Sequence, residues 1–230
     1  MEDFLKRLRS KVTVALVGGS DLVKIAEQMG GHDGLMKNFD YVFAENGLVA
    51  FKAGEQIGQE NLLHYKGEET LQKVINFALR YMSDLKLPAK RGTFIEFRSS
   101  MLNICPVGRS CSQAEREGFA AFDKENNVRQ KFVEALYKEF PQSESGLVFA
   151  IGGQISIDVF PVGWDKTFCL KFIEKDGYKT MHFFGDKTSK GGNDHEIFAD
   201  SRTIGHTVTG PEDTMKQLDK LYFNEQQTAS

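Results

Sequence analysis

Two aspartates in the last quarter of the sequence are candidates for holding a cation. Asp186 directly follows the apolar run 180–184, which we interpret as a buried strand, and Asp200 lies fourteen positions further on. Open α/β sheets bind their ligands at the carboxyl ends of the strands. Carboxylates without a His or Cys cluster suit a hard cation such as Mg²⁺. On residue types alone, an Asp that ends a strand and an Asp that caps a turn account for the pair about as well.

Two further side chains are placed where a phosphate group would be held. Ser20 follows Gly18-Gly19 at a predicted junction between strand and helix, where backbone N–H groups and the helix dipole favour an anion. An ordinary helix N-cap is the competing interpretation, and the G-x-x-x-x-G-K-[ST] pattern of a P-loop is absent. Lys166 opens a predicted helix and carries an ammonium that would neutralise a phosphate, although lysines in such positions are commonly just exposed.

Polar side chains gather on one face of the predicted strands in the middle of the chain. Arg98, Arg109 and Arg116 lie in or near these strands, and the guanidinium fork matches phosphate oxygens with two hydrogen bonds. Ser156 and Asp158 are two residues apart on one strand, so they share a face and are placed to bind sugar hydroxyls. A solvated, charged surface is the alternative interpretation.

The composition is that of a folded protein. The 230 residues are 40% hydrophobic and 27% charged, and the net charge of −3 shows no basic footprint of a nucleic-acid binder. Three cysteines without metal-ligand spacing favour a reducing compartment, by default the cytosol. No run approaches the roughly 20 apolar residues of a membrane-spanning helix, so we expect neither a nucleic acid nor a membrane as partner.

The two ends of the chain follow a pattern of alternating strands and helices, which favours a parallel sheet covered by helices. The predicted elements are a strand at 12–17, a helix from Ser20 or Asp21 to Met29, a strand at 41–43, a helical stretch at 166–173, strands at 180–184 and 206–209, and a helix at 211–222. We predict a mobile tail at 225–230.

The middle of the chain follows a different pattern, with strands joined by tight turns. The predicted elements are a helix carrying Leu71 to Met82, strands at 93–98 and 101–105, a helix from Val128 that Pro141 ends, and strands at 147–151 and 155–160. Ser99-Ser100 and Gly152-Gly153 are the two turns. We therefore expect an antiparallel sheet with helices on its apolar face, inserted between two halves of an α/β domain.

Seven strings of the sequence, in this order, closely resemble the eukaryotic phosphomannomutases of the haloacid dehalogenase superfamily. They are VGGSD (17–21), YVFAENGLV (41–49), RGTFIEFR (91–98), GRSCS (108–112), GGQIS (152–156), GWDK (163–166) and GDKTSKGGNDHEIF (185–198). So many long strings in one order are highly specific.

The resemblance implies a fold and an activity. The fold is α/β, a Rossmann-like haloacid dehalogenase core with an inserted α+β cap that contains an antiparallel sheet. Its parts are a first core segment at 1–56, the cap at 57–162 and a second core segment at 163–230. The implied activity is the interconversion of mannose 6-phosphate and mannose 1-phosphate through an aspartyl-phosphate, on the route to GDP-mannose in the cytoplasm.

The resemblance also assigns roles to individual residues. The sugar phosphate would be held by Arg98, Arg109, Arg116, Ser156 and Asp158; Mg²⁺ would be held by Asp186, Asp200, Thr203 and the carbonyl of Phe198; and the transferring phosphoryl group would be held by Ser20 and Lys166. It further implies a hexose 1,6-bisphosphate as activator and a homodimer formed through the cap.

One departure from the family pattern is large. Family members carry an Asp-x-Asp-Gly motif after a first core strand, and its two aspartates are the nucleophile and the acid/base. The present sequence contains no Asp-x-Asp, so we expect this first strand to be missing and a polypeptide of these 230 residues to lack turnover. The alternatives are a non-catalytic fragment that binds sugar phosphates or dimerises, and a sugar phosphatase of the same superfamily.

Overall fold

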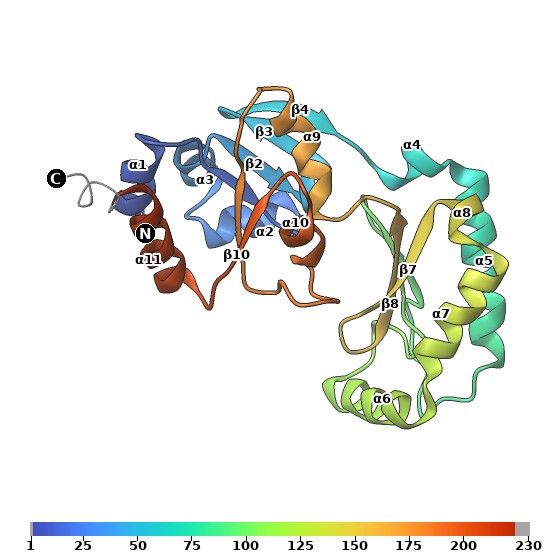
Figure 1. Ribbon diagram of the computed structural model, residues 1–230. Helices are drawn as coiled ribbons and strands as arrows, with labels where there is room; N and C mark the ends of the chain where they lie inside the picture. The colour runs from blue at the N-terminus through green and yellow to red at the C-terminus, as the bar shows by residue number, and fades with distance from the viewer. Residues whose placement is uncertain (1, 224–230) are drawn as a thin grey trace. The chain divides into compact units, whose positions relative to one another are not determined.

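The computed structural model describes residues 2–223, so the predicted tail at 225–230 lies outside the described residues (Figure 1). The chain divides into two compact units. Unit 1 comprises residues up to Gln59 and from Gly163 onward, and unit 2 comprises Glu60–Val162. The boundary follows residue 59 rather than the predicted residue 56, because the last strand before it pairs with its neighbour up to Gln59.

Unit 1 contains two sheets. In the first, β1 and β2 are parallel and β3 and β4 are antiparallel additions, in the order β1-β2-β3-β4. In the second, β9 and β10 form a parallel pair. The strands are β1 (Ala15–Val17), β2 (Tyr41–Ala44), β3 (Val49–Lys52), β4 (Glu55–Gln59), β9 (His182–Gly185) and β10 (Ile204–Thr207). The expected parallel pairings are confirmed, and β3 and β4 are additions that the sequence analysis did not predict.

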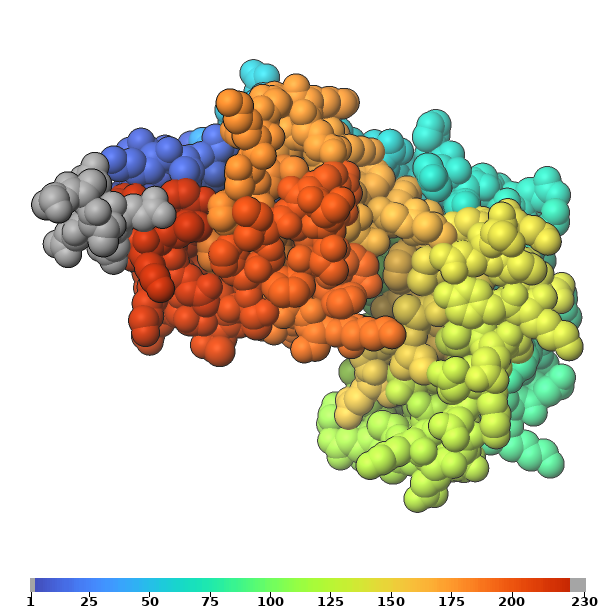
Figure 2. All heavy atoms as spheres, in the orientation of Figure 1, coloured from blue at the N-terminus to red at the C-terminus, as the bar shows by residue number. Residues whose placement is uncertain are grey.

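Helices surround these strands. They are α1 (Glu2–Arg9), α2 (Leu22–Gln28), α3 (His32–Asn38), α9 (Leu170–Glu174), α10 (His195–Ala199) and α11 (Pro211–Tyr222), with the 3-10 turns η1 (Glu45–Gly47) and η2 (Lys166–Cys169). The carboxylate of Asp21 accepts the N–H of Lys24 and caps α2. Residues after 163 form much of the face of unit 1 that Figure 2 shows.

A cavity of about 810 Å³ lies between β1 and β9. Residues 14–17 of one sheet and 181–186 of the other line it, together with side chains from α1 and α11. Each of the two strands has one neighbour in its sheet, and alternate residues of a strand direct their backbone groups to opposite sides. The backbone groups of Ala15 and Val17, and those of His182 and Phe184, are therefore directed away from the neighbouring strand.

Unit 2 is built on an antiparallel sheet in the order β5-β6-β8-β7. The strands are β5 (Ile95–Phe97), β6 (Leu102–Ile104), β7 (Leu147–Gly152) and β8 (Ser156–Pro161). The predicted apolar face is confirmed, because Leu102, Ile104, Ile157 and Val159 are fully buried.

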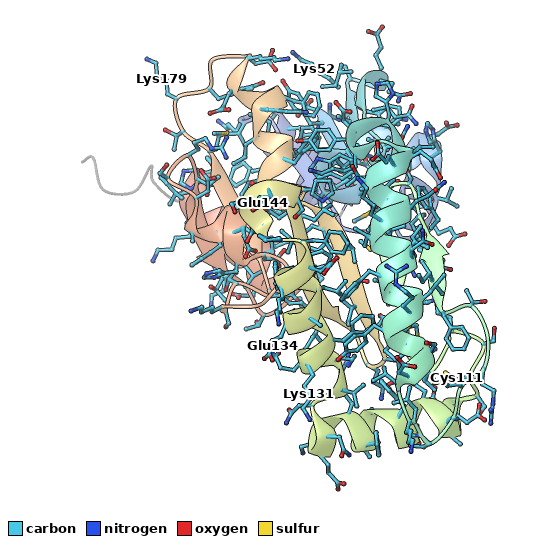
Figure 3. The ribbon with its side chains drawn as sticks, turned by 90° about the vertical axis from the view of Figure 1, so that its right-hand side faces the viewer. Lys52, Cys111, Lys131, Glu134, Glu144 and Lys179 are labelled. Carbon is cyan, nitrogen blue, oxygen red and sulfur yellow. The ribbon has the colours of Figure 1, made fainter. Side chains whose placement is uncertain are left out.

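Helices cover this apolar face, and Figure 3 shows α5 and α7 side by side. The helices of unit 2 are α4 (Leu62–Lys66), α5 (Glu68–Asp84), α6 (Gln113–Asn126), α7 (Val128–Glu139) and α8 (Gln142–Ser145). The rings of Tyr81 and Phe132 stack with centroids 4.2 Å apart and join α5 to α7, and Tyr137 of α7 meets Phe149 of β7 edge to face. In the described part of the chain, none of the helices is both long enough and apolar enough to cross a membrane.

Candidate active site

The polar face of the unit 2 sheet carries a row of three side chains in register. Glu96 of β5 is paired with Asn103 of β6, and Asn103 is paired with Asp158 of β8. Because cross-strand partners project from the same face, their side chains are direct neighbours. The hairpins therefore place three polar groups from distant parts of unit 2 in one line.

Two predicted arginines join this row. Arg98 donates from Nε to Oε2 of Glu96 at 2.6 Å, and Nε of Arg109 lies 3.3 Å from the same oxygen. Arg109 also donates from Nη1 to Oδ1 of Asn103 at 2.8 Å, and the Asn103 amide donates to Oδ1 of Asp158 at 2.6 Å. The structure thus brings together Arg98, Arg109 and Asp158, and it adds Glu96 and Asn103 as the groups that hold them.

The other two residues predicted for this face are placed differently. Ser156 is buried, and its hydroxyl donates to the carbonyl of Gly152 at 3.0 Å, so it closes the turn between β7 and β8. Arg116 lies in the first turn of α6 and is half-buried; among residues 2–223 its guanidinium has neither a hydrogen bond nor an ion pair. The network of Arg98 and Arg109 therefore does not include Arg116.

A glycine makes room for Asp158. A Cβ atom at Gly152, which is paired with Ser156 across the hairpin, would lie 2.2 Å from Oδ2 of Asp158. Real Cβ atoms do not approach an oxygen so closely, so any larger residue would force the carboxylate to move. The glycine of the GGQIS string is thus required by the position of Asp158.

A buried ion pair behind the hairpin was not found from the sequence. Arg129 donates from Nε to Asp123 at 2.7 Å, and their side chains are 11% and 10% exposed. Its Nη1 donates to the carbonyls of Gly152, Gly153 and Ser156 at 3.0–3.4 Å. Arg129 therefore fixes the backbone of the turn that carries Ser156 and leads to Asp158.

In unit 1, Lys166 is held by a partner that the sequence analysis did not select. Its Nζ donates to Oδ1 of Asp194 at 2.5 Å, and the two side chains are 11% and 4% exposed. Burial alone would raise the pKa of Asp194, but hydrogen bonds from Lys166 and from the N–H of Lys187 outweigh it and lower the pKa. The pair is therefore a buried, charged lysine and carboxylate at the cavity wall.

Asp186 lines the same cavity as this pair. It comes directly after β9 and is exposed. Gly185 precedes it, and a Cβ atom there would lie 2.7 Å from Oδ2 of Asp194. The glycine thus lets Asp194 lie against the end of β9, and the structure brings Lys166, Asp186 and Asp194 to one cavity.

The other predicted metal ligands lie in the second half of α10, which holds Phe198, and in the segment that follows it, which holds Asp200 and Thr203. Arg202 donates to both carboxylate oxygens of Asp200, at 2.8 and 2.7 Å, and these hydrogen bonds lower the pKa of Asp200. The hydroxyl of Thr203 donates to the carbonyls of Ile197 and Asp200. The carbonyl of Phe198 lies close against Gly205 of β10.

Two of the predicted metal ligands are engaged within their own segment, Asp200 by Arg202 and Thr203 by the carbonyls of Ile197 and Asp200. Over residues 2–223, no three His, Cys, Asp or Glu side chains are arranged to hold an ion. Oxygen donors suit Mg²⁺ chemically, but Asp200 is engaged by Arg202 and Asp194 by Lys166. Of the two predicted carboxylate ligands, Asp186 is therefore the one that no basic side chain within residues 2–223 engages.

Ser20 lies in an exposed loop and is not among the residues that line the cavity. Its carbonyl accepts the N–H of Glu45 at 2.9 Å, and the N-cap role of α2 belongs to Asp21. Asn46 connects this loop to the lysine segment, because its backbone N–H donates to the carbonyl of Gly18 and its side chain donates to the carbonyl of Trp164 at 3.2 Å.

Comparison with known proteins identifies the family. Residues 1–224 match the family described as eukaryotic phosphomannomutase. The chain is 56% identical to a phosphomannomutase of Triticum aestivum over 225 residues, which is 98% of this chain and 88% of that protein. It is 54% identical to phosphomannomutase 1 of Homo sapiens over 222 residues, covering 96% of this chain and 84% of that protein.

A solved structure supports the fold. A haloacid dehalogenase-like hydrolase from Bacteroides thetaiotaomicron aligns with a TM-score of 0.54 and 12% identity, covering 96% of this chain and 91% of that one. At this identity the likeness concerns the fold alone, and it agrees with the expected core with an inserted cap. By its sequence, the chain belongs to the eukaryotic phosphomannomutase family.

Proposed function

We propose that this chain carries the substrate-binding residues of a phosphomannomutase, an enzyme that interconverts mannose 6-phosphate and mannose 1-phosphate. The family membership supports this proposal. The observation that carries it is the network on the polar face of unit 2, in which Arg98 and Arg109 are held beside Asp158.

The polar face offers complementary groups for a hexose phosphate. Guanidinium forks bind phosphate oxygens through paired, charge-assisted hydrogen bonds. A carboxylate such as that of Asp158 accepts hydrogen bonds from sugar hydroxyls. Asn103 connects the two kinds of group, because it accepts from Arg109 and donates to Asp158. A ligand with a phosphate at one end and hydroxyls at the other therefore suits this face.

The cavity of unit 1 would supply the charge neutralisation for phosphoryl transfer. Lys166 keeps its ammonium at the cavity wall because Asp194 accepts its hydrogen bond. Positive groups that are already in place stabilise the negative charge of the transferring group without reorganisation. Ser20 is proposed to hold the same group.

Further parts of the proposal follow from the family. They are Mg²⁺, with Asp186 as one ligand and Phe198, Asp200 and Thr203 as the others; a hexose 1,6-bisphosphate activator; a role in GDP-mannose synthesis; Arg116 as a third phosphate ligand; and a homodimer through unit 2. The three free cysteines support a reducing, cytosolic location.

Catalytic activity of this polypeptide depends on whether it contains a nucleophile. Since its 230 residues contain no Asp-x-Asp, we propose that it binds hexose phosphates without isomerising them. The test is a coupled assay for mannose 1-phosphate isomerisation with the purified chain and with a fusion to the Asp-x-Asp segment of a curated relative. We expect turnover from the fusion alone, and none from a control fusion in which both aspartates are Asn.

The same assay separates the competing functions. Isomerisation by the unfused 230 residues would overturn the proposed inactivity. Phosphate release without isomerisation, from the fusion, would favour a sugar phosphatase. A chain that binds hexose phosphate but gains no activity from the fusion would favour a non-catalytic binding protein, a second candidate that the intact network of Arg98, Arg109 and Asp158 supports.

A further inference from the structure

Glu96 occupies the place between the two arginines of the polar face. Its Oε2 atom accepts Nε of Arg98 at 2.6 Å and lies 3.3 Å from Nε of Arg109. All three side chains are reached by solvent, with 38% of Glu96, 39% of Arg98 and 31% of Arg109 exposed. The carboxylate therefore covers the same Nε edges of the forks that a phosphate would bind.

The two arginines depend on Glu96 to different degrees. Arg109 keeps a second hydrogen bond, to Asn103, and Asn103 is in turn fixed by Asp158. For Arg98, the other contact within residues 2–223 is a weak one, with Nη1 4.0 Å from the sulfur of Met101. If the carboxylate of Glu96 left, Arg109 would stay in place and Arg98 would be free to turn toward an incoming anion.

The exchange of one anion for another is energetically easy here. Exposed ion pairs contribute little to stability, whereas a phosphate dianion presents more acceptor oxygens and more negative charge to the two guanidinium groups than one carboxylate does. A carboxylate that remains beside the bound dianion also repels it. Glu96 thus competes with the ligand and lowers the affinity of the two arginines for phosphate.

We propose that Glu96 is a resident counter-ion of Arg98 and Arg109, which the phosphate of the ligand displaces. This inference rests on the proposed function of the polar face. Its consequence is a phosphate site that binds less tightly than two guanidinium groups alone would. Such a site releases its phosphate readily, as a mutase requires when a bisphosphate must present each end in turn.

The test measures binding of mannose 1-phosphate to the whole chain by titration calorimetry at low salt. The Glu96→Gln variant keeps the size of the side chain and removes its charge, and we expect it to bind roughly tenfold more tightly, since one like charge at contact distance is removed. The advantage should shrink as salt is added, because salt screens exposed charges. Glu96→Ala should shift affinity in the same direction.

Glu134→Gln is the matched control, because Glu134 is exposed on α7 and labelled in Figure 3, and its change removes the same charge from the same unit. Unchanged or weaker binding by Glu96→Gln, when the wild type binds and Arg109→Gln does not, would overturn the counter-ion role and leave the proposed function standing. No binding by the wild type, or equal binding by Arg109→Gln, would instead contradict the proposed function.

Discussion

The two units hold their functional residues in different ways. In unit 2, Glu96, Asn103 and Asp158 lie in one cross-strand row of a single sheet, and hydrogen bonds join them to two arginines. In unit 1, the predicted residues lie on separate loops: Lys166 and Asp186 line the cavity, whereas Asp200 pairs with Arg202 and Ser20 is elsewhere.

The difference follows from how each unit brings its residues together. The sheet of unit 2 is made of short hairpins, so the register of neighbouring strands aligns the polar row. The site of unit 1 depends on β1 and β9, which belong to different sheets and face one cavity. The residues of unit 2 are thus aligned by strand register, whereas those of unit 1 are placed by the loops that follow its strands.

The contrast between buried and exposed charge predicts the largest effect. Asp194→Asn leaves the buried ammonium of Lys166 without its counter-charge, and we expect it to lower the free energy of unfolding of unit 1 by about 3–5 kcal/mol. The loss is measured by urea unfolding, with the fluorescence of Trp164 as the probe. Trp164 is the single tryptophan and is buried in unit 1. Glu96→Gln should cost less than about 1 kcal/mol.

Equal losses in the free energy of unfolding for Asp194→Asn and Glu96→Gln would contradict the expected difference between a buried and an exposed ion pair. Asp33→Asn is the control for the loss of one negative charge from unit 1, because the Asp33 side chain is fully exposed.

The next effect concerns the ion pair behind the hairpin of unit 2. Arg129→Met leaves the carboxylate of Asp123 buried and unpaired and frees three carbonyls of the turn. We expect a loss of about 3 kcal/mol, seen as faster hydrogen exchange in peptides from 60–162. The double variant that also carries Asp123→Leu should regain part of the stability, because it no longer buries an unpaired carboxylate. If the double variant is as unstable as Arg129→Met, lost packing rather than the unpaired charge causes the loss.

A smaller effect tests whether the glycine of the turn positions Asp158. Gly152→Ala introduces a Cβ that meets Oδ2 of Asp158, so we expect about tenfold weaker binding of mannose 1-phosphate, or about 1.4 kcal/mol. Gly118→Ala is the matched control, since that Cβ meets nothing within 4 Å and the position is helical. Undiminished binding by Gly152→Ala would mean that Asp158 does not touch the sugar.

The smallest effect is a difference in acid sensitivity. Hydrogen bonds from Lys52 and Arg202 lower the pKa values of Asp176 and Asp200 in unit 1, where the pKa of Asp194 is lowered too. A carboxyl with a lowered pKa stabilises the fold above its unfolded pKa, and this is lost as the pH falls through the folded pKa. We expect the free energy of unfolding followed by Trp164 fluorescence to fall on acidification. The fall should be smaller in Asp194→Asn, which lacks one of these carboxyls.

Most of the fold was predictable from local patterns. The strands of unit 2 carry alternating apolar residues between turns, and α5 and α7 carry helical periodicity, so the register of β5 with β6 was predicted correctly. The register of β7 with β8 was not, because Gly152 pairs with Ser156 instead of forming the turn. The strand β4 was missed because its side chains are mostly exposed and show no apolar alternation. The short helix α3 was missed because Gly34 interrupts it.

The candidate site was predictable only in part. Motif resemblance selected Arg98, Arg109 and Asp158, which the structure joins, and the alternation of the strands around Ser99-Ser100 places Asn103 on the same polar face. Neither pattern gave a signal for Arg129. The hydrogen bonds of Asn103 with Asp158 and of Arg129 with three turn carbonyls are tertiary contacts, which no spacing in the sequence encodes. Asp194 was likewise part of a matched string, and only its burial against Lys166 distinguishes it.

The arginine face of unit 2 is proposed to bind a hexose phosphate, and the other proposals depend on this binding. Titration calorimetry of the purified 230-residue chain with mannose 1-phosphate, beside Arg109→Gln, tests it most directly. We predict saturable binding by the wild type and a loss of about 100-fold in the variant, because a charge-assisted pair with phosphate is removed. Absence of heat with the folded wild type, or the same affinity in both proteins, would contradict the claim.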